Sequence, residues 1–197
     1  MTLGQLATIR TGYLARRAVV PDANGSHHLV QIGDFDSAKT LLNATALLRF
    51  TPEASISVKP LCAGEVLFMA KGQRPFAYAI EALPEPSLAA ANFFVLRPES
   101  NLNADYLAWY LNRESVIRSL TAQAGSGVYL PVIRRTMLEN LVIPLPPLKT
   151  QLALVELDRL ARQEESLLAD LGRKRREMLD FYNRQILRPF EETGAQP

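Results

Sequence analysis

Proline residues divide this sequence into two parts of different character. Residues 144–147 read Pro-Leu-Pro-Pro, and because proline fixes φ and has no amide hydrogen, a helix does not run through them. Before this junction short apolar runs alternate with glycine, proline and asparagine, whereas 149–187 is rich in Leu, Glu and Arg and contains no proline. The pattern predicts a globular domain over 1–147, a helical region over 148–190 and a flexible tail over 191–197.

The first part predicts a mixture of strands and helices. Its apolar runs favour strands at 29–32 and 91–96, and either a strand pair or one bent strand at 58–74. The run 3–11 favours a short helix or a strand. The expected fold class is α+β, with a mixed α/β domain followed by a long coiled-coil-like helix.

A helix is expected shortly after residue 100. Asn101 or Asn103 can cap its first turn, because a side-chain oxygen accepts a hydrogen bond from a backbone N–H that has no partner there. Tyr106 and Tyr110 are four residues apart, and the same apolar face continues to Ile117. This spacing predicts one helix from the cap to about Ile117.

The second part predicts an amphipathic helix that is too long to pack on itself. Apolar residues recur about every 3.5 positions, and a continuous helix of this length spans about 60 Å at 1.5 Å per residue. The residues expected to face a partner are Leu152, Leu160, Leu167, Leu171, Met178 and Phe181. Glu164 and Lys174 fall on the apolar stripe, and Gly172 costs a helix about 1 kcal/mol. A kinked helix or a pair of helices is therefore the alternative to a regular two-stranded coiled coil.

A basic run at 173–176 lies on this helix between acidic residues. Asp170, Glu177 and Asp180 flank the run, mostly at the helical spacings of three and four that allow ion pairs along an exposed face. Contact with DNA is the alternative role for this run.

Composition excludes several classes of protein. The chain has 197 residues, of which 48% are hydrophobic and 21% are charged, a profile typical of a globular chain with a buried core. No apolar run approaches the roughly 20 residues of a membrane-spanning helix, and the first residues lack the pattern of a secretory signal, so a cytoplasmic protein is expected. One cysteine and two histidines make no disulfide and no zinc site of the usual kind, so no metal is expected.

Several common catalytic motifs are missing from the sequence. An amino-methyltransferase places Asn or Asp before a Pro-Pro-aromatic segment, but here Leu145 precedes the two prolines and Leu148 follows them. No lysine has a carboxylate two positions earlier, as common restriction nucleases require, and no Gly-x-x-x-x-Gly-Lys-Ser/Thr phosphate loop occurs. We therefore expect no catalytic residue and no cofactor in this chain.

Four local clusters combine positive charge, small residues and planar or amide side chains. The net charge is only +2, so a DNA partner has to be sought in local patches. The residues expected to contact DNA are Arg10, Tyr13, Arg16 and Arg17 in the first cluster, Gln31 in the second, Lys71, Gln73 and Arg74 in the third, and Ser126 and Tyr129 in the fourth. Each cluster taken alone also fits an ordinary solvated loop.

The chemistry of these side chains predicts which of them contact bases and which contact phosphates. Arginine bonds guanine and glutamine bonds adenine through paired hydrogen bonds, whereas lysine and serine usually contact phosphates. Arg74 and Gln73 are therefore the expected base readers. Tyr13 and Tyr129 fit a contact with sugar or base and a core position equally well.

The order of the segments resembles the specificity subunit of type I restriction-modification systems. The segments that carry the resemblance are 3–13, 64–68 with 71–72, 94–98, 105–112, 125–127, and 141–148 with Gln151. The last of them, Ile-Pro-Leu-Pro-Pro-Leu followed three residues later by glutamine, is the most specific, and the ordered set extends through almost the whole chain.

The resemblance implies a recognition domain and a spacer. In that family a target recognition domain reads one half of a split DNA site, and the following helix is a spacer that docks on the methyltransferase subunits. Methyl transfer to adenine and ATP-driven translocation with cleavage belong to the modification and restriction subunits, so this chain is expected to be non-catalytic. The recognition residues vary with the target in this family, so no base contact is carried over.

The sequence departs from the family pattern in its length. The usual subunit has two recognition domains and two spacer helices, whereas this sequence has one of each. A homodimer of half-subunits would restore the two-fold arrangement, and its DNA site would then be a palindrome. The alternatives are pairing with a different half-subunit, an interaction or anti-restriction module that binds the methyltransferase without reading DNA, and an enzyme with an unrecognised site.

Overall fold

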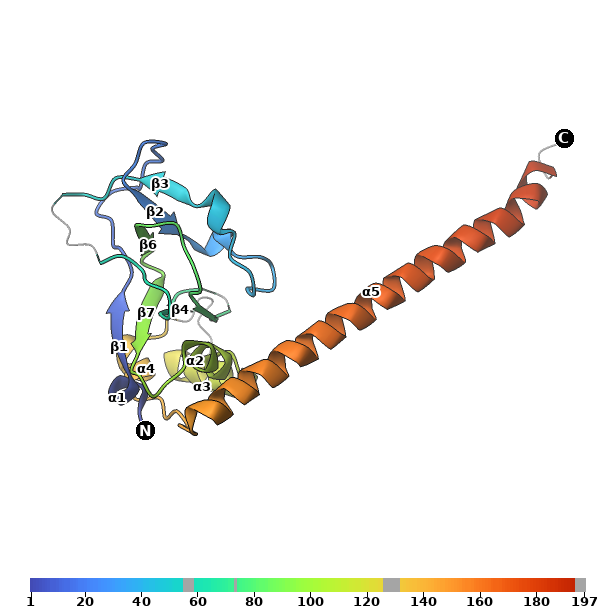
Figure 1. Ribbon diagram of the computed structural model, residues 1–197. Coiled ribbons are helices and arrows are strands. Elements are labelled where there is room, and N and C mark those ends of the chain that lie inside the picture. The colour runs from blue at the N-terminus through green and yellow to red at the C-terminus, as the bar shows by residue number, and fades with distance from the viewer. Residues whose placement is uncertain (55–58, 73, 126–131, 194–197) are drawn as a thin grey trace. The chain divides into compact units, whose positions relative to one another are not determined.

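The computed structural model describes residues 1–54, 59–72, 74–125 and 132–193, the last few of these by their backbone alone. The chain forms two compact units, Met1–Ala153 and Leu154–Pro197. Strands and short helices make up the first unit, and a long helix continues into the second (Figure 1). The expected α+β class with a long C-terminal helix is confirmed.

The main sheet of the first unit has four antiparallel strands in the order β1-β7-β4-β5. They are β1 (Ala7–Thr11), β7 (Phe93–Pro98), β4 (Val66–Met69) and β5 (Ala77–Ala79). Every residue of β4 is buried, as expected of a central strand covered on both faces. The described residues of the run expected at 58–74 therefore contain one strand, not two, because its hairpin partner β5 lies further along the chain.

A second, three-stranded sheet has the order β3-β2-β6. It consists of β3 (Leu48–Phe50), β2 (His27–Val30) and β6 (Ser87–Ala89), with β2 antiparallel to β3 and parallel to β6. Only β2 matches a strand expected from the sequence. Val30 and Ala89 from this sheet pack in one core cluster with Leu67 and Val95 of the main sheet, so a shared core holds the two sheets together.

Short helices surround the sheets. They are α1 (Leu3–Leu6), α2 (Ala104–Leu111), α3 (Glu114–Gly125) and α4 (Arg135–Glu139), with 3-10 turns η1 (Ile32–Asp34) and η2 (Ala44–Ala46). Helix α2 contacts β4, β5 and β7. The run 3–11, which was expected to form a short helix or a strand, forms both: α1 followed by β1.

The helix expected between the cap and Ile117 is correct only in its first part. Asn103 is the cap, since its Oδ1 accepts a hydrogen bond from the N–H of Tyr106 at 2.9 Å. Helix α2 ends at Leu111, and Ile117 belongs to α3. The break leaves Asn112 between the two helices. Its side chain accepts a hydrogen bond from the N–H of Ala77 at 2.8 Å and donates one to the C=O of Ala77 at 2.7 Å, which completes the edge of β5.

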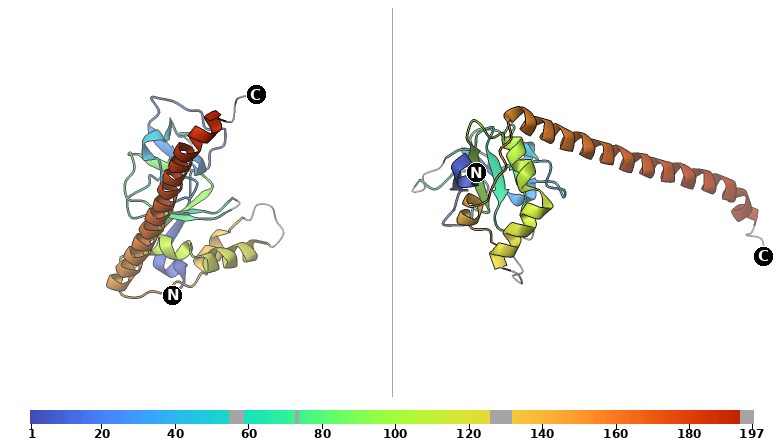
Figure 2. Two further views of the ribbon diagram at one scale, coloured as in Figure 1. Left: turned by 90° about the vertical axis from the view of Figure 1, so that its right-hand side faces the viewer. Right: turned by 90° about the horizontal axis from the view of Figure 1, so that it is seen from below.

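Helix α5 (Leu148–Thr193) begins directly after the proline segment. It is one continuous helix, also through Gly172, in both views of Figure 2, so the alternative of a helix pair is wrong. Its last residue lies three positions beyond the expected end at 190. Among the described residues, no helix is both long enough and apolar enough to cross a membrane.

Exposed ion pairs run along α5. Arg173 bonds Asp170 at 3.0 Å and Glu177 at 3.2 Å, which confirms the ion pairing expected around the basic run. Arg159 with Glu156 and Arg162 with Asp158 form two further pairs, each at 2.7 Å. Exposed pairs of this kind add only about 0.3–0.5 kcal/mol each to helix stability, so they mainly keep this face polar.

Candidate nucleic-acid interface

The connection between β6 and β7, residues 89–93, is the point where the first three clusters meet. The N–H of Tyr13 donates to the carbonyl of Ala89 at 2.7 Å, and the N–H of Ala90 donates to the carbonyl of Val30 at 2.9 Å. The N–H of Ala70 donates to the carbonyl of Asn92, also at 2.9 Å. Backbone hydrogen bonds thus fix Tyr13 of the first cluster, and the residues directly before Gln31 and Lys71, around one short segment.

The start of the third cluster lies beside the segment that follows the fourth cluster, although about sixty residues separate these two segments in sequence. Lys71 forms an isolated antiparallel bridge with Val132, and the N–H of Ile133 donates to the carbonyl of Ala70 at 2.9 Å. Three residues of these clusters, Gln73, Ser126 and Tyr129, lie outside the described residues. The described residues 70–71 and 132–133 are therefore adjacent in the fold.

All these anchor points belong to one end of the main sheet. At this end Thr11 pairs with Phe94 and Met69 pairs with Phe93, whereas Ala7 and Pro98 form the opposite end. Figure 1 shows the β3-β2-β6 sheet beyond the first end and α1 and α4 near the other. The structure therefore brings together residues in or next to the first three clusters, which the sequence spreads over about sixty positions.

Gly12 permits the close approach on which this arrangement depends. A Cβ atom at this position would lie 2.1 Å from the carbonyl oxygen of Ala90 and 2.7 Å from that of Ala89. Both oxygens belong to backbone and cannot turn aside as a flexible side chain can. Only glycine allows the chain to pass here from β1 into the first cluster.

Most of the predicted basic residues are available to an outside partner. Arg16, Arg17, Lys71 and Arg74 are exposed, and none of them forms a salt bridge with any residue that the structure describes. The N–H of Arg16 donates to Oε1 of Glu53 at 2.9 Å, which holds the backbone of the first cluster without using the guanidinium. Exposed cations of this kind are what phosphate binding requires.

Arg10 is the exception, because its guanidinium is already used inside the domain. It donates to Oε2 of Glu65 at 2.9 Å and to the backbone carbonyls of Lys59 and Pro60 at 2.8 and 3.1 Å. Glu65 is 1% exposed, and its other oxygen accepts from Arg97 at 3.0 Å. The predicted DNA contact at Arg10 is thus replaced by a structural role, in which Arg10 neutralises a buried carboxylate.

Glu65 is the residue of this network that sequence reasoning missed. It follows Gly64, and the pair Gly-Glu is typical of an exposed turn. The backbone does turn there, but the N–H of Cys62 and two arginines from other strands converge on the carboxylate. No local pattern signals those partners.

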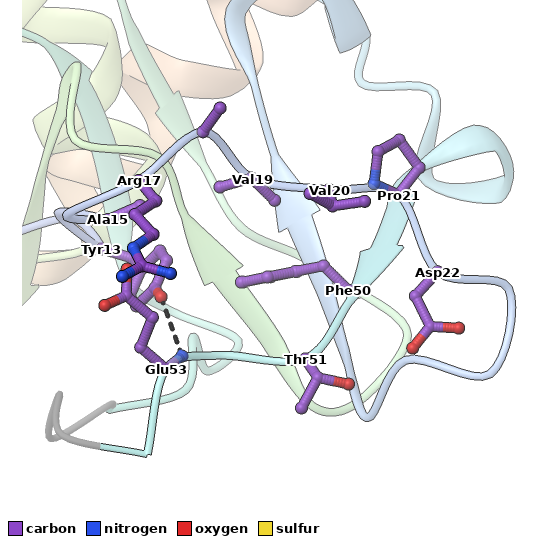
Figure 3. A pocket seen from close by; sticks show the side chains of 11 residues that line it. Tyr13, Ala15, Arg17, Val19, Val20, Pro21, Asp22, Phe50, Thr51 and Glu53 are labelled. Carbon is purple, nitrogen blue, oxygen red and sulfur yellow. Dashed lines mark hydrogen bonds between the residues drawn. The ribbon is translucent and has the colours of Figure 1, made fainter.

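Tyr13 packs within the domain, beside a surface cavity. Its ring lies 5.3 Å from that of Phe50, and its hydroxyl oxygen accepts from the N–H of Glu53 at 3.1 Å. Figure 3 shows these side chains at a cavity of about 520 Å³, whose lining also includes Arg17 and Asp22. Of the two roles that the sequence left open for Tyr13, the structure shows the packing role.

Gln31 lies at the end of β2, where the chain enters η1. It is exposed, and its N–H donates to Oδ2 of Asp34 at 2.6 Å. Burial raises the pKa of Asp34 above its ordinary value, against the opposing effect of this hydrogen bond. The bond uses only the backbone of Gln31, so the amide side chain is presented on the surface.

The leucines and aromatic residues expected to face a partner on α5 are exposed. The exposed fractions are Leu152 53%, Leu160 49%, Leu167 61%, Leu171 65%, Met178 52% and Phe181 52%. Apolar side chains this exposed and this regularly spaced are typical of an interaction surface. Within the described residues, no group of three or more His, Cys, Asp or Glu is placed to hold a metal ion.

Comparisons with known proteins find similarity at the level of the fold. No family model matches the chain, and no curated protein matches it. The crystal structure of the HsdS subunit from Thermoanaerobacter tengcongensis is 21% identical, with a TM-score of 0.53 over 84% of this chain and 37% of that one. A chain from a structural study of complex assembly and conformational transition of the type I R-M system is 23% identical, with a TM-score of 0.52 over 84% of this chain and 38% of that one.

The protein therefore has the fold of type I restriction-modification HsdS specificity subunits, as the resemblance implied. It spans less than two-fifths of the length of the two solved structures.

Proposed function

We propose that this chain is a DNA-binding specificity subunit of a type I restriction-modification complex. The observation that carries the proposal is the HsdS fold, found over 84% of the chain. Described residues in or next to the first three candidate DNA-binding clusters gather around the connection between β6 and β7, which supports the proposal independently of any relative. In this proposal Met1–Ala153 is the recognition unit and reads one half of a split site.

The exposed residues of the clusters divide into base readers and phosphate contacts. Arg74 is the principal base reader, because an exposed arginine that forms no salt bridge with the described residues can give two hydrogen bonds to guanine. Lys71, three residues earlier, and the pair Arg16 and Arg17 bind phosphates and set the position of the unit on the duplex. In this proposal the amide of Gln31 also contacts the duplex, as do Gln73, Ser126 and Tyr129.

Helix α5 is the spacer of this proposal. It carries exposed apolar residues along its length, with Leu152 near its start and Phe181 near its end. The helix serves both to dock an adenine-specific DNA methyltransferase subunit and to pair with a second copy of the chain. Two identical recognition units then read the two halves of a palindromic bipartite site in cytoplasmic DNA.

Catalysis belongs to the partners in this scheme. The methyltransferase subunit transfers the methyl group, and a restriction subunit, where the system has one, translocates and cleaves DNA. The residues of this chain bind and orient the duplex, so that the target adenine is presented to the partner.

The test is base-resolved sequencing of N6-methyladenine in the source genome with and without this gene. We expect methylation to disappear from one bipartite motif on deletion and to return when the wild-type gene is restored. A palindromic motif supports the homodimer over pairing with a different half-subunit. An unchanged methylation pattern in a strain whose methyltransferase is expressed contradicts the specificity function and favours a module that binds the enzyme without reading DNA.

A further inference from the structure

The apolar stripe of α5 is interrupted by two opposite charges. Eight residues of the second unit, which we call the seam, follow one another at alternating steps of three and four: Leu157, Leu160, Glu164, Leu167, Leu171, Lys174, Met178 and Phe181. The six apolar members are between 49% and 66% exposed. This is the spacing of a coiled-coil interface, in which an isolated polar residue costs stability but specifies how the helices align.

The two charges are placed symmetrically on the seam. Glu164 and Lys174 lie five residues on either side of Ala169. The apolar members share this symmetry, since Leu167 and Leu171 are each two residues from Ala169. A helix with such a centre can meet a reversed copy of itself so that every seam residue faces another seam residue.

We infer that two copies of the chain pair through antiparallel α5 helices with their two-fold axis at Ala169, so that Glu164 lies beside Lys174 of the partner subunit. The inference rests on the self-pairing proposed above and specifies its direction and register. The symmetry produces two such ion pairs, one on each side of the axis. Between them, Leu167 packs against Leu171 of the partner subunit.

Other alignments of the same two helices leave charges without partners. A parallel pair in register sets Glu164 against Glu164 of the partner subunit, and like charges in contact are repulsive. An antiparallel pair shifted by one heptad sets Glu164 against an apolar residue, either Leu167 or Phe181 of the partner subunit. A charge held against an apolar surface loses hydration without compensation. Opposite charges therefore select the register centred on Ala169.

Two apolar residues on one side of the seam fit this register. Leu168, 60% exposed, lies next to the axis and meets Leu168 of the partner subunit. Tyr182, 55% exposed, is set opposite Leu154 of the partner subunit. A shallow groove of about 350 Å³ along α5, lined by Leu160, Glu164, Leu167 and Leu171 among others, receives the seam of the second copy.

The test reverses the two charges singly and together in the full-length protein, with dimer dissociation followed by sedimentation velocity over a dilution series. Glu164→Lys sets lysine against Lys174 of the partner subunit, and Lys174→Glu sets two glutamates together. We expect each single variant to raise the dimer dissociation constant at least about tenfold. The double variant restores opposite charges and is expected to return to within about threefold of wild type. A mixture of the two single variants should form heterodimers of wild-type strength, because both ion pairs reform between unlike chains.

The control variant is Glu165→Lys, which makes the same change one position away and outside the seam. It should leave the dissociation constant within about twofold of wild type, and circular dichroism should show equal helix content in all variants. A monomeric wild-type chain overturns the inference. So does a dimer in which the single reversals act like the control, or in which the double variant stays as weak as the singles.

The outcome is separable from that of the proposed function. A dimer insensitive to Glu164→Lys refutes the register, while the loss of a methylated motif on gene deletion still establishes the specificity role. An unchanged methylation pattern refutes the specificity role, while recovery in the double variant still establishes the register.

Discussion

Gln151 accepts a hydrogen bond through its Oε1 from the backbone N–H of Asn103 at 2.8 Å, across 48 positions of sequence. Its Nε2 donates to the carbonyls of Asn101 and Pro146 at 2.9 and 2.8 Å. The side chain is completely buried and fixes the first turn of α5 to the loop before α2. This explains physically why a glutamine follows the proline segment.

Gln151→Ala should lower the free energy of unfolding by about 1–3 kcal/mol, because it leaves one buried N–H and two carbonyls with fewer partners. Urea denaturation of the full chain measures the change. The matched control is Gln163→Ala, the same substitution at an exposed position of the same helix, for which we expect less than about 0.5 kcal/mol. Equal effects of the two substitutions would contradict the structural role of Gln151.

Glu65→Ala should destabilise the recognition unit by about 1–3 kcal/mol, since Cys62 loses the partner of its N–H and two arginines lose theirs. Arg10→Ala should also destabilise it but leave the sequence preference for DNA unchanged. Thermal denaturation and a duplex-binding assay on matched and mismatched sites separate these effects. Glu99→Ala, at an exposed carboxylate, serves as the control. A change in base preference with Arg10→Ala would restore Arg10 to the DNA interface.

Gly12→Ala should destabilise the protein by about 3 kcal/mol or more, because the new methyl group collides with two backbone carbonyls of the 89–93 connection. Gly33→Ala is the matched control, since a Cβ atom there meets nothing within 4 Å. Chemical denaturation of the two variants side by side tests the expectation. A Gly12→Ala protein as stable as Gly33→Ala would show that the close approach is relaxed in solution.

Arg74→Ala should cost roughly 1–3 kcal/mol in binding to the cognate site and relax specificity at one base pair. Lys71→Ala should weaken binding about equally on all sequences and reduce its dependence on salt. Binding to the cognate duplex and to single-base variants at several salt concentrations distinguishes the two. Identical losses for both substitutions on every sequence would refute the division into base reader and phosphate contact.

Asp34 and Asp36 should affect the pH dependence of stability in opposite directions. Burial raises the pKa of Asp34 above 3.8, so folding favours its protonated form and its contribution to stability falls as the pH rises above 3.8 through the folded pKa. Hydrogen bonds from Leu41 and Thr40 hold the pKa of Asp36 below 3.8, so its contribution is present above that pH and is lost as the pH falls through the folded pKa.

The measurement is the free energy of unfolding of wild type, Asp34→Asn and Asp36→Asn as a function of pH. Relative to wild type, Asp34→Asn should become more stable as the pH rises above 3.8, because it cannot be charged. Asp36→Asn should show its largest deficit above the same pH, where the wild-type carboxylate is ionised. The same sign for both variants would contradict the surroundings described for these two carboxyl groups.

Local patterns were sufficient where a structure depends on residues close together in sequence. The proline segment located the start of α5 at Leu148, the asparagines before an apolar face narrowed the cap of α2 to Asn101 or Asn103, of which the structure shows Asn103, and the charge pattern predicted the ion pairs of Arg173. A cap, a turn of helix and a pair three residues apart each involve neighbours. The symmetric placement of Glu164 and Lys174 is likewise a property of the sequence alone.

Only the tertiary structure decided which distant segments meet. Strands of three residues, such as Ala77–Ala79 and Ser87–Ala89, are too short for a period of two to be recognised. The role of Arg10 depends on Glu65, and the position of Lys71 depends on its bridge with Val132. Such contacts follow from strand register and core packing, which no local sequence pattern determines. The sequence by itself therefore determined the long C-terminal helix and the candidate residues, whereas the fold decided which of these residues bond within the domain and which are left exposed at its surface.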